Sequence, residues 1–390
     1  MFKAEVRAQL EQKILPFWMG LKDETFGGFY GYMDNNLILD RTADKGCILN
    51  SRILWFFSSA AEALKSDGLR QYADHAMDFF RRFEDPDHGG VFWSVTYDGK
   101  PSDTTKHTYC QAFAIYGLAA YYRLTGDKQA LDRAMALFQL IESRCKDEGG
   151  YLEALKADFS PESNEKLSEN GIMASRTMNT LLHVIEAYAE LYRVHPDPQV
   201  RIAGIEGLNQ CLNTIYNPGK RRLEVFFDGN FRPILDMQSY GHDIEASWLI
   251  WDAAETFLEP TERDPWQKMC LDLAQSSTER AFTDHGLHYE IVDGAVNTNR
   301  AWWPQAEALL GFEFAFRMTG DPAWIKRMRT QWDYILRTIV DPREGSEWFN
   351  EVREDGTLIY EKPMVEEWKC PYHNGRMCLR LIKAELPEDL

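Results

Sequence analysis

The chain lacks the features that mark a membrane-spanning, secreted or disulfide-rich protein. Nowhere among its 390 residues do eighteen apolar residues follow one another, and the N-terminal segment has no apolar core long enough for a signal peptide. The seven cysteines are an odd number without a C-x-x-C pair, which favours reduced, mostly buried thiols over disulfides or a zinc ribbon. We therefore expect a cytoplasmic protein with no membrane partner.

Positive charge is scarce. Lys and Arg number 43 against 61 Asp and Glu, which gives a formal net charge of −18. A surface of this sign repels the phosphates of nucleic acid and anionic lipid, so we expect a neutral or cationic small molecule as partner. For the chain itself we expect a monomer or a weak homodimer.

Motifs that bind phosphate, dinucleotides or zinc are also missing. The sequence contains no G-x-x-x-x-G-K, no G-x-G-x-x-G after a strand, no H-E-x-x-H and no G-x-S-x-G elbow. Ligands far apart in sequence can still share a metal, so a site of His183, His242 and His373 stays open as an alternative. Our main prediction is a protein without a metal or another cofactor.

A repeat of about 60 residues runs through the chain. A glycine pair followed by aromatic residues occurs at Gly27-Gly28, Gly89-Gly90 and Gly149-Gly150, and weaker copies follow around residues 223, 286 and 345. Six units account for the whole length, with no linker between them. The sequence thus predicts one repeat domain over residues 1–390.

Each unit contains one amphipathic and one apolar helical segment. The amphipathic segments are predicted at Phe2–Trp18, Gln71–Phe83, Lys128–Arg144, Gln199–Tyr216, Pro265–Phe282 and Ala323–Val340. The apolar segments are predicted at Cys47–Leu64, Thr105–Thr125, Thr177–Val194, Tyr240–Phe257, Asn299–Thr319 and Cys370–Ala384. Six such pairs bury their apolar faces by closing into an all-α (α/α)6 barrel, with the apolar helices inside. An open solenoid is the alternative, but it would need polar capping helices at both ends.

If the six inner helices run parallel, their N-terminal ends open at one mouth. An unpaired polar side chain on a buried helix costs about 1–3 kcal/mol, so polar first turns on all six helices are best explained by a shared pocket. These residues are Asn50 and Arg52, His107 and Tyr109, Asn179 and His183, His242 and Glu245, Trp302, Trp303 and Glu307, and His373 with Arg376.

Two pairs of these residues share a helical face. Asn179 and His183 are four residues apart, and His242 and Glu245 are three apart. We expect Glu245 to hydrogen-bond His242 and to fix its tautomer. For His107, a purely structural role is an equal alternative.

The pocket residues favour proton transfer beside a carbonyl. A glycoside hydrolase is the main alternative by fold analogy, with Glu245 and Glu307 as its two carboxylates. However, imidazole titrates near pH 6.5, which suits removal of a proton next to an aldehyde better than protonation of a glycosidic oxygen. Two histidines on non-adjacent helices would let one group remove the proton and another return it from the opposite face.

Four segments resemble the cellobiose 2-epimerases, within the N-acylglucosamine 2-epimerase superfamily. They are Lys45 to Trp55, Ser239 to Ala246, Trp302-Trp303 with Glu307, and Trp368 to Cys378. The resemblance implies a metal- and nucleotide-independent enzyme. It would convert the reducing-end glucose of cellobiose, lactose or short β-1,4 oligosaccharides to mannose, and the reverse.

The resemblance also implies a role for each matching residue. His242 and His373 would exchange the C2 proton through a cis-enediol, with Glu245 orienting His242 and Arg52 binding the carbonyl or enediolate oxygen. The remaining roles concern sugar binding: Asn179 and His183 would hold the hydroxyls around C1 and C2, Trp303 and Trp368 would stack on the rings, and Tyr109 and Glu307 would line the site. A monosaccharide epimerase, an aldose–ketose isomerase, a glycoside hydrolase and a catalytically silent sugar-binding barrel remain the alternatives.

Overall fold

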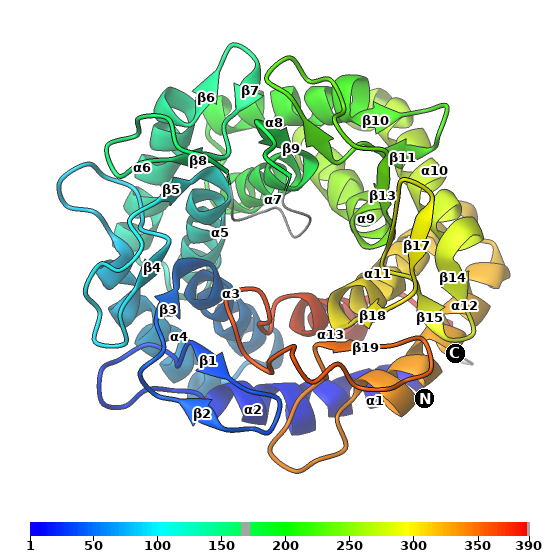
Figure 1. Ribbon diagram of the computed structural model, residues 1–390, viewed down its shortest axis with the longest axis horizontal. Coiled ribbons are helices and arrows are strands. Elements are labelled where there is room, and N and C mark those ends of the chain that lie inside the picture. The colour runs from blue at the N-terminus through cyan, green and yellow to red at the C-terminus, as the bar shows by residue number, and fades with distance from the viewer. Residues whose placement is uncertain (165–171, 388–390) are drawn as a thin grey trace.

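Two concentric rings of helices build the molecule, as seen down its shortest axis in Figure 1. The computed structural model describes residues 1–164 and 172–387. In these residues the inner ring consists of α3 (Cys47–Leu64), α5 (Thr108–Thr125), α7 (Met178–Val194), α9 (Tyr240–Phe257), α11 (Trp302–Thr319) and α13 (His373–Lys383). Residues near the N-terminal ends of all six helices line one pocket, so the inner helices are parallel, as predicted.

The outer ring is built from the amphipathic segments. Three of its members continue from an α-helix into a π-helical turn. The outer elements are α1 (Phe2–Gln9), η1 (Leu10–Ile14) and α2 (Leu15–Met19); α4 (Asp67–Phe80) and η2 (Arg81–Phe83); α6 (Lys128–Arg144); α8 (Pro198–Gln210) and η3 (Cys211–Ile215); η4 (Pro260–Glu262) and α10 (Asp264–Ala281); α12 (Pro322–Tyr334) and η5 (Ile335–Ile339).

Local sequence explains why the two rings differ. In α3 the whole stretch from Cys47 to Ala61 is buried, which fits a helix that is apolar on all sides. By contrast, α4 buries only one face, and its N-terminus is capped by Ser66, whose Oγ accepts a hydrogen bond from the Leu69 amide at 3.3 Å. Helix α5 ends where Gly126 takes a left-handed conformation, with φ of 73°.

The ring closes between the first and last units. Helix α13 packs against both α3 and α11, and α1 packs against α13. The blue N-terminal helix therefore lies beside the orange α12 in Figure 1, where Glu5 Oε2 accepts hydrogen bonds from Trp332 Nε1 and Arg329 Nη1, both at 2.9 Å. This closure confirms the predicted (α/α)6 barrel and rules out the open solenoid.

Short strands connect the helices, and the sequence did not predict them. Most are only two residues long, too short to show an alternating pattern. They are β1 (Tyr32–Met33), β2 (Leu39–Asp40), β3 (Lys45–Gly46), β4 (Ser94–Val95), β5 (Lys106–His107), β6 (Lys146–Asp147), β7 (Gly150–Tyr151), β8 (Ala154–Leu155), β9 (Arg176–Thr177), β10 (Tyr216–Asn217), β11 (Arg222–Leu223), β12 (Phe226–Phe227), β13 (Met237–Ser239), β14 (Phe282–Thr283), β15 (Gly286–Leu287), β16 (Glu290–Val292), β17 (Ala295–Asn297), β18 (Arg300–Ala301) and β19 (Glu351–Val352).

These strands form a chain of ladders around the mouth. The strand before each of the first five inner helices pairs with a strand from the following connection: β3 with β4, β5 with β8, β9 with β12, β13 with β16, and β18 with β19. The bridge between Met33 and Val365 joins the connection before α13 to the first connection of the chain. The ladders thereby fix where each inner helix begins.

The ladders explain the errors in the predicted helix bounds. The bounds of α3, α6 and α9 match the prediction, whereas α5 and α11 begin three residues later than predicted. The residues just before them, Lys106-His107 and Arg300-Ala301, pair as strands instead. Helix α13 is also shorter than predicted at both ends.

Two composition-based expectations concern the whole chain. All seven cysteines are buried and free, as expected for structural thiols. Within the described ranges, no helix has both the length and the apolar character that crossing a lipid bilayer would require.

Candidate active site

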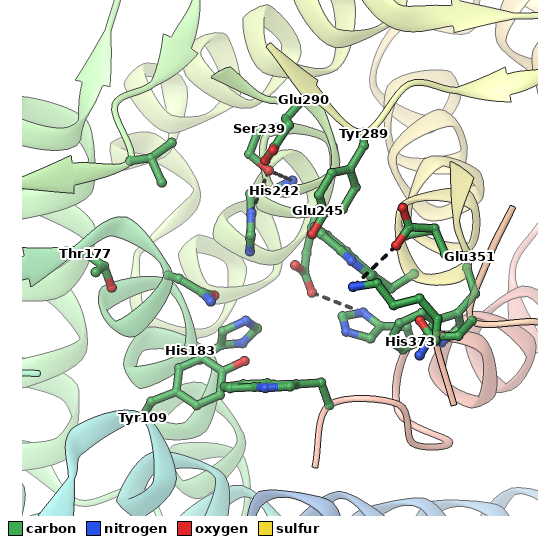
Figure 2. Close-up of a pocket in the computed structure, with 18 of the residues that line it drawn as sticks. Tyr109, Thr177, His183, Ser239, His242, Glu245, Tyr289, Glu290, Glu351 and His373 are labelled. Atoms are coloured by element: carbon green, nitrogen blue, oxygen red, sulfur yellow. Dashed lines mark hydrogen bonds and ion pairs between the residues drawn. The ribbon is translucent and has the colours of Figure 1, made fainter. Parts of the chain in front are cut away.

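A pocket opens at the mouth of the inner ring, and Figure 2 shows the side chains that line it. Its volume is about 1110 Å³, including the open entrance. Nine of the ten predicted site residues line it: Arg52, Tyr109, Asn179, His183, His242, Glu245, Trp303, Trp368 and His373. The tenth, Glu307, lies directly behind His373.

His242 and His373 meet at the indole of Trp303. The ring centroids of His242 and Trp303 are 4.7 Å apart, and those of His373 and Trp303 are 5.4 Å apart. In Figure 2 the two imidazoles approach the cavity from different helices. The ring closure thus brings together two residues that are far apart in sequence.

His242 is held by Ser239 and not by Glu245. Its Nδ1 lies 2.7 Å from Ser239 Oγ, which also accepts the His242 backbone N–H at 3.4 Å as the N-cap of α9. The prediction that Glu245 bonds His242 is wrong, because three-residue spacing places both side chains on one face without fixing their rotamers. Burial, with a smaller contribution from His183, lowers the pKa of His242 to about 3, which keeps it neutral.

His373 is held by a carboxylate. Its Nδ1 lies 2.7 Å from Glu307 Oε1, while Glu307 Oε2 accepts the Trp248 indole N–H at 2.9 Å. Burial raises the pKa of Glu307, but Arg376 and Trp248, which can only donate, oppose this shift. Their bonds favour the ionised form of Glu307 and hence the Nδ1–H tautomer of His373. Its Nε2 is then free to accept a proton. Burial, followed by Arg52 and Arg376, holds the pKa of His373 well below its usual range.

Arg376 ties three buried carboxylates together. Its Nη2 donates to Glu245 Oε1 and Glu307 Oε1, both at 2.7 Å, and its Nη1 donates to Glu186 Oε1 at 2.5 Å. One guanidinium cannot neutralise all three. Burial and the charge of Glu307 raise the pKa of Glu245 well above its usual range, so Glu245 is the member that takes up a proton. Its Oε2 has no hydrogen-bond partner among the described residues.

His183 is fixed in the same manner as His373. Its Nδ1 lies 2.8 Å from Glu186 Oε2, which also accepts the Tyr372 hydroxyl at 2.5 Å. Although burial opposes ionisation, Arg376 and His183 bring the pKa of Glu186 down to about 2. Glu186 therefore carries the negative charge that orients His183.

Arg52 offers a buried positive charge to the cavity. Its Nη2 donates to the Tyr109 hydroxyl at 2.7 Å, and its guanidinium lies over the rings of Phe113 and Tyr372 at 4.1 and 4.5 Å. Among the described residues no carboxylate forms a salt bridge with Arg52. A developing oxyanion would be its natural counter-charge.

The structure also bears on the metal alternative. In the described part of the chain, the group with ligand atoms within 4.8 Å of one another is Glu245, Glu307 and His373, not the three histidines considered above. Arg376 Nη2 already binds the Oε1 atoms of both glutamates. A guanidinium thus occupies the place that a cation would take.

The outer half of the pocket is polar and lies away from Tyr109 and Thr177 in Figure 2. Tyr289, Glu290 and Glu351 line it, together with Lys362, whose Nζ lies 3.6 Å from Glu351 Oε2. The cavity therefore presents hydrogen-bonding groups on this side as well as around the histidines.

Comparisons with known proteins identify the family of the chain. The family model of N-acylglucosamine 2-epimerase matches residues 28–374. The chain belongs to the N-acylglucosamine 2-epimerase family.

Individual relatives cover nearly the whole chain. Cellobiose 2-epimerase from Eubacterium cellulosolvens is 48% identical, over 97% of this chain and 98% of its own. Cellobiose 2-epimerase from Ruminococcus albus is 44% identical, over 98% of each chain. The crystal structure of a sugar epimerase from a ruminal bacterium superimposes with a TM-score of 0.98 at 43% identity, covering 99% of this chain and all of its own. Family membership makes the chain a carbohydrate epimerase.

In this member of the N-acylglucosamine 2-epimerase family, sequence reasoning missed several side chains that support the histidines. Ser239, Trp248, Glu186 and Tyr372 had no assigned contact, and Arg376 was placed in a first turn without a role. One signal was available, since Glu186 follows His183 by three residues, as Glu245 follows His242. The contacts of Tyr372 and Trp248 cross between helices, and no local spacing predicts them. His107, by contrast, caps α5 through its Nδ1 and does not line the pocket.

Proposed function

We propose that this enzyme reversibly epimerises C2 of the reducing-end glucose of cellobiose and related β-1,4-linked disaccharides, giving mannose. The observation that carries the proposal is the pair of histidines, His242 and His373, that face one cavity beside Arg52, whose guanidinium has no carboxylate partner among the described residues. Such a pair can remove a proton from one face of a carbon and return a proton to the other.

The proposed reaction passes through an open-chain aldehyde and a cis-enediol. The sugar ring opens when the C1 hydroxyl proton is lost and the ring oxygen gains a proton. One neutral histidine then accepts the C2 proton and becomes an imidazolium, while electron density moves to the carbonyl oxygen. The partner histidine, which has accepted the C1 hydroxyl proton during ring opening, returns a proton to the opposite face of C2. Because the reaction is reversible, each histidine fills both roles.

Arg52 is proposed to stabilise the oxyanion of the enediolate. Its buried charge acts in a low-dielectric site, and the N-termini of six helices add partial positive charge at the same mouth. Glu307 holds His373 as the Nδ1–H tautomer and supports its imidazolium. Glu245 has a role different from the expected one, since it binds Arg376 and offers a protonated carboxyl to the cavity.

The other side chains are proposed to bind the sugar. Asn179 and His183 lie where they can hold the hydroxyls around C1 and C2, and Asn179 Oδ1 is buried with no partner among the described residues. Trp303 and Trp368 provide ring faces for stacking, and Tyr109 lines the wall between Arg52 and Trp368. The second sugar would occupy the polar outer half, which supports a disaccharide substrate.

Lactose, converted to epilactose, is proposed as a further substrate, because it presents the same reducing-end glucose. We further propose that residues 1–390 act as one catalytic domain in the cytoplasm, as a monomer or weak homodimer, without a metal or nucleotide. The acidic composition and the contribution of every inner helix to one pocket support this.

Incubation with cellobiose in deuterated water, followed by NMR, tests the proposal. Deuterium at C2 of a 4-O-glucosyl-mannose is the expected result. Glucose release would identify a hydrolase, a ketose product would identify an aldose–ketose isomerase, and an unchanged sugar would leave only a binding protein. The same assay on mannose and N-acylglucosamine tests the monosaccharide alternative.

The carboxylate geometry argues against the hydrolase. Glycoside hydrolysis needs two carboxyl groups on either side of the scissile bond, about 5–9.5 Å apart. Glu245 and Glu307 instead both bind one nitrogen of Arg376, and neither faces the other across the cavity.

A further inference from the structure

A pair of positions recurs beneath the ladders of the mouth. The first is the residue two places before an inner helix. The second lies in the turn that precedes this helix, where its backbone pairs with that of a glycine. In the first three units these positions hold a buried base and an acid that form an ion pair. The pairs are Lys45 with Asp23 at 2.7 Å, Lys106 with Asp85 at 2.8 Å, and Arg176 with Asp147 at 2.5 Å.

In the fourth unit both charges are lost together. Gln238 stands two residues before α9, and Asn217 ends β10 as Asp147 ends β6. Neither side chain is ionisable, so no charge is left unbalanced. In this unit both positions are therefore uncharged.

The fifth unit differs from the first four. Arg300 stands two residues before α11, but the partner position is Thr283, which pairs with Gly286 as Asp147 pairs with Gly150. The base is kept and the acid is gone. In the third unit Nη2 of Arg176 binds Asp147, whereas Nη2 of Arg300 has no hydrogen-bond partner among the described residues.

The surroundings of Arg300 do not replace the missing acid. The residue is fully buried, its Nε donates to the His285 carbonyl at 2.6 Å, and its Nη1 donates to the Thr298 carbonyl. Two neighbours within electrostatic reach also have buried polar atoms that lack partners in the described ranges: the Tyr334 hydroxyl and both ring nitrogens of His288. Burial lowers the pKa of Arg300, while Tyr334 and the more distant carboxylate of Glu354, which forms no salt bridge with it among the described residues, oppose this shift.

The geometry points to a binding site for a small monovalent anion such as chloride, formed by Arg300 Nη2, the Tyr334 hydroxyl and a ring N–H of His288. The anion takes the place of the carboxylate that the first three units carry. A guanidinium, a phenol and an imidazole can all donate hydrogen bonds to it. Burying a charge requires a counter-charge, and the described residues supply none in direct contact with Arg300.

The site has a consequence for the pocket. His288 precedes Tyr289 and Glu290, which line the outer half, and Arg300 precedes Trp302 and Trp303 of α11. A bound anion would join these two segments to the outer helix α12 through Tyr334. It would therefore stabilise the wall that faces the second sugar.

Thermal unfolding in sodium chloride, compared with sodium gluconate at equal ionic strength, tests the inference in solution. For the unaltered protein we expect a saturable rise in Tm with chloride of roughly 2–4 °C. Arg300→Gln, which copies the fourth unit, and Thr283→Asp, which restores the acid of the first three, should both lose this rise. Thr283→Asp keeps the test decisive if Arg300→Gln fails to fold.

Crystals grown in sodium bromide test where the anion binds. An anomalous peak in contact with Arg300 Nη2 and the Tyr334 hydroxyl is expected in the unaltered protein and should be missing in Thr283→Asp. No peak, or an equal chloride response in all three proteins, would overturn the inference. A peak without the chloride-specific rise in Tm would mark an adventitious ion only and would also overturn it.

Discussion

The two histidines of the site are held by different groups, and this difference affects their chemistry. His373 faces the Glu307 carboxylate, which fixes one tautomer and stabilises the imidazolium. His242 faces the hydroxyl of Ser239, which can either donate or accept and therefore permits both tautomers. Substitutions of the two partners should consequently have effects of different size.

Glu307→Gln should lower kcat by about 10–100-fold, because a hydrogen bond to a charged group contributes about 1.5–3 kcal/mol. KM for cellobiose should change much less, since the carboxylate supports the histidine and does not line the cavity. Steady-state kinetics with cellobiose, together with C2 deuterium uptake, measure both.

The matched control is Glu313→Gln on the same helix. Glu313 pairs with Arg317 at 3.8 Å, near the opposite end of α11, and has no contact with the pocket. The Glu313→Gln variant should have the same kcat for cellobiose as the unaltered enzyme. Equal losses in the two variants would show that Glu307 acts only through stability.

Ser239→Ala should have a smaller effect, with kcat reduced about 3–10-fold, because a hydrogen bond between neutral groups contributes about 0.5–1.5 kcal/mol. The substitution also removes the N-cap of α9, which costs about 1 kcal/mol of stability. Ser239→Thr keeps the hydroxyl and should restore most of kcat. If Ser239→Thr were as slow as Ser239→Ala, the hydroxyl would have no role in positioning His242.

For single residues, the sequence predicted which side chains share the pocket, but not every contact between them. The placement of His242, His373 and Arg52 in one pocket followed from the repeat and from helical first turns. The partner of His242 was wrong because two acceptors, Ser239 and Glu245, lie within one turn of it, and sequence spacing cannot choose between their rotamers.

At the scale of elements, buried ion pairs lie under the ladders just before the first three inner helices. Lys106 and Asp85 are almost fully buried, and their charged groups lie 2.8 Å apart just before α5. The sequence could not reveal such pairs, because the two members lie in different segments of the chain. The helices were predictable because their apolar segments are long, while the strands were not because most contain only two residues.

Asp85→Asn should lower the free energy of unfolding by about 3–5 kcal/mol, because it leaves the Lys106 ammonium buried without a counter-charge. The double variant Asp85→Asn, Lys106→Gln copies Asn217 and Gln238 of the fourth unit and should recover most of the loss. Urea denaturation monitored by tryptophan fluorescence measures both. A double variant no more stable than the single one would mean that the ion pair is not the cause.

At the scale of the whole molecule, ring closure makes the site. Trp303 lies between His242 of α9 and His373 of α13, and α13 reaches this place only because it packs between α11 and α3. Closing the ring also buries ionisable groups of both signs in one interior. The pH dependence of stability therefore reports on the whole barrel as well as on its parts.

Two adjacent residues should bias this pH dependence in opposite directions. Burial lowers the pKa of His242 to about 3 and raises the pKa of Asp243 to about 7. Between pH 5 and 6.5 the unfolded chain therefore binds a proton at His242 that the folded protein does not, so this histidine makes stability fall on acidification. The folded protein holds a proton on Asp243 that the unfolded chain has released, so this aspartate makes stability rise on acidification.

Removing either side chain should change the slope of the free energy of unfolding against pH. Relative to the unaltered protein, His242→Asn should become more stable between pH 6.5 and 5, and Asp243→Asn less stable, each by at most about 1.4 kcal/mol per pH unit. Urea denaturation at several pH values in this window gives the slopes, whatever constant loss each substitution causes. Parallel profiles in all three proteins would show that neither side chain changes its protonation on folding. Tilts of the same sign would contradict the opposite shifts that burial imposes on an imidazole and a carboxyl group.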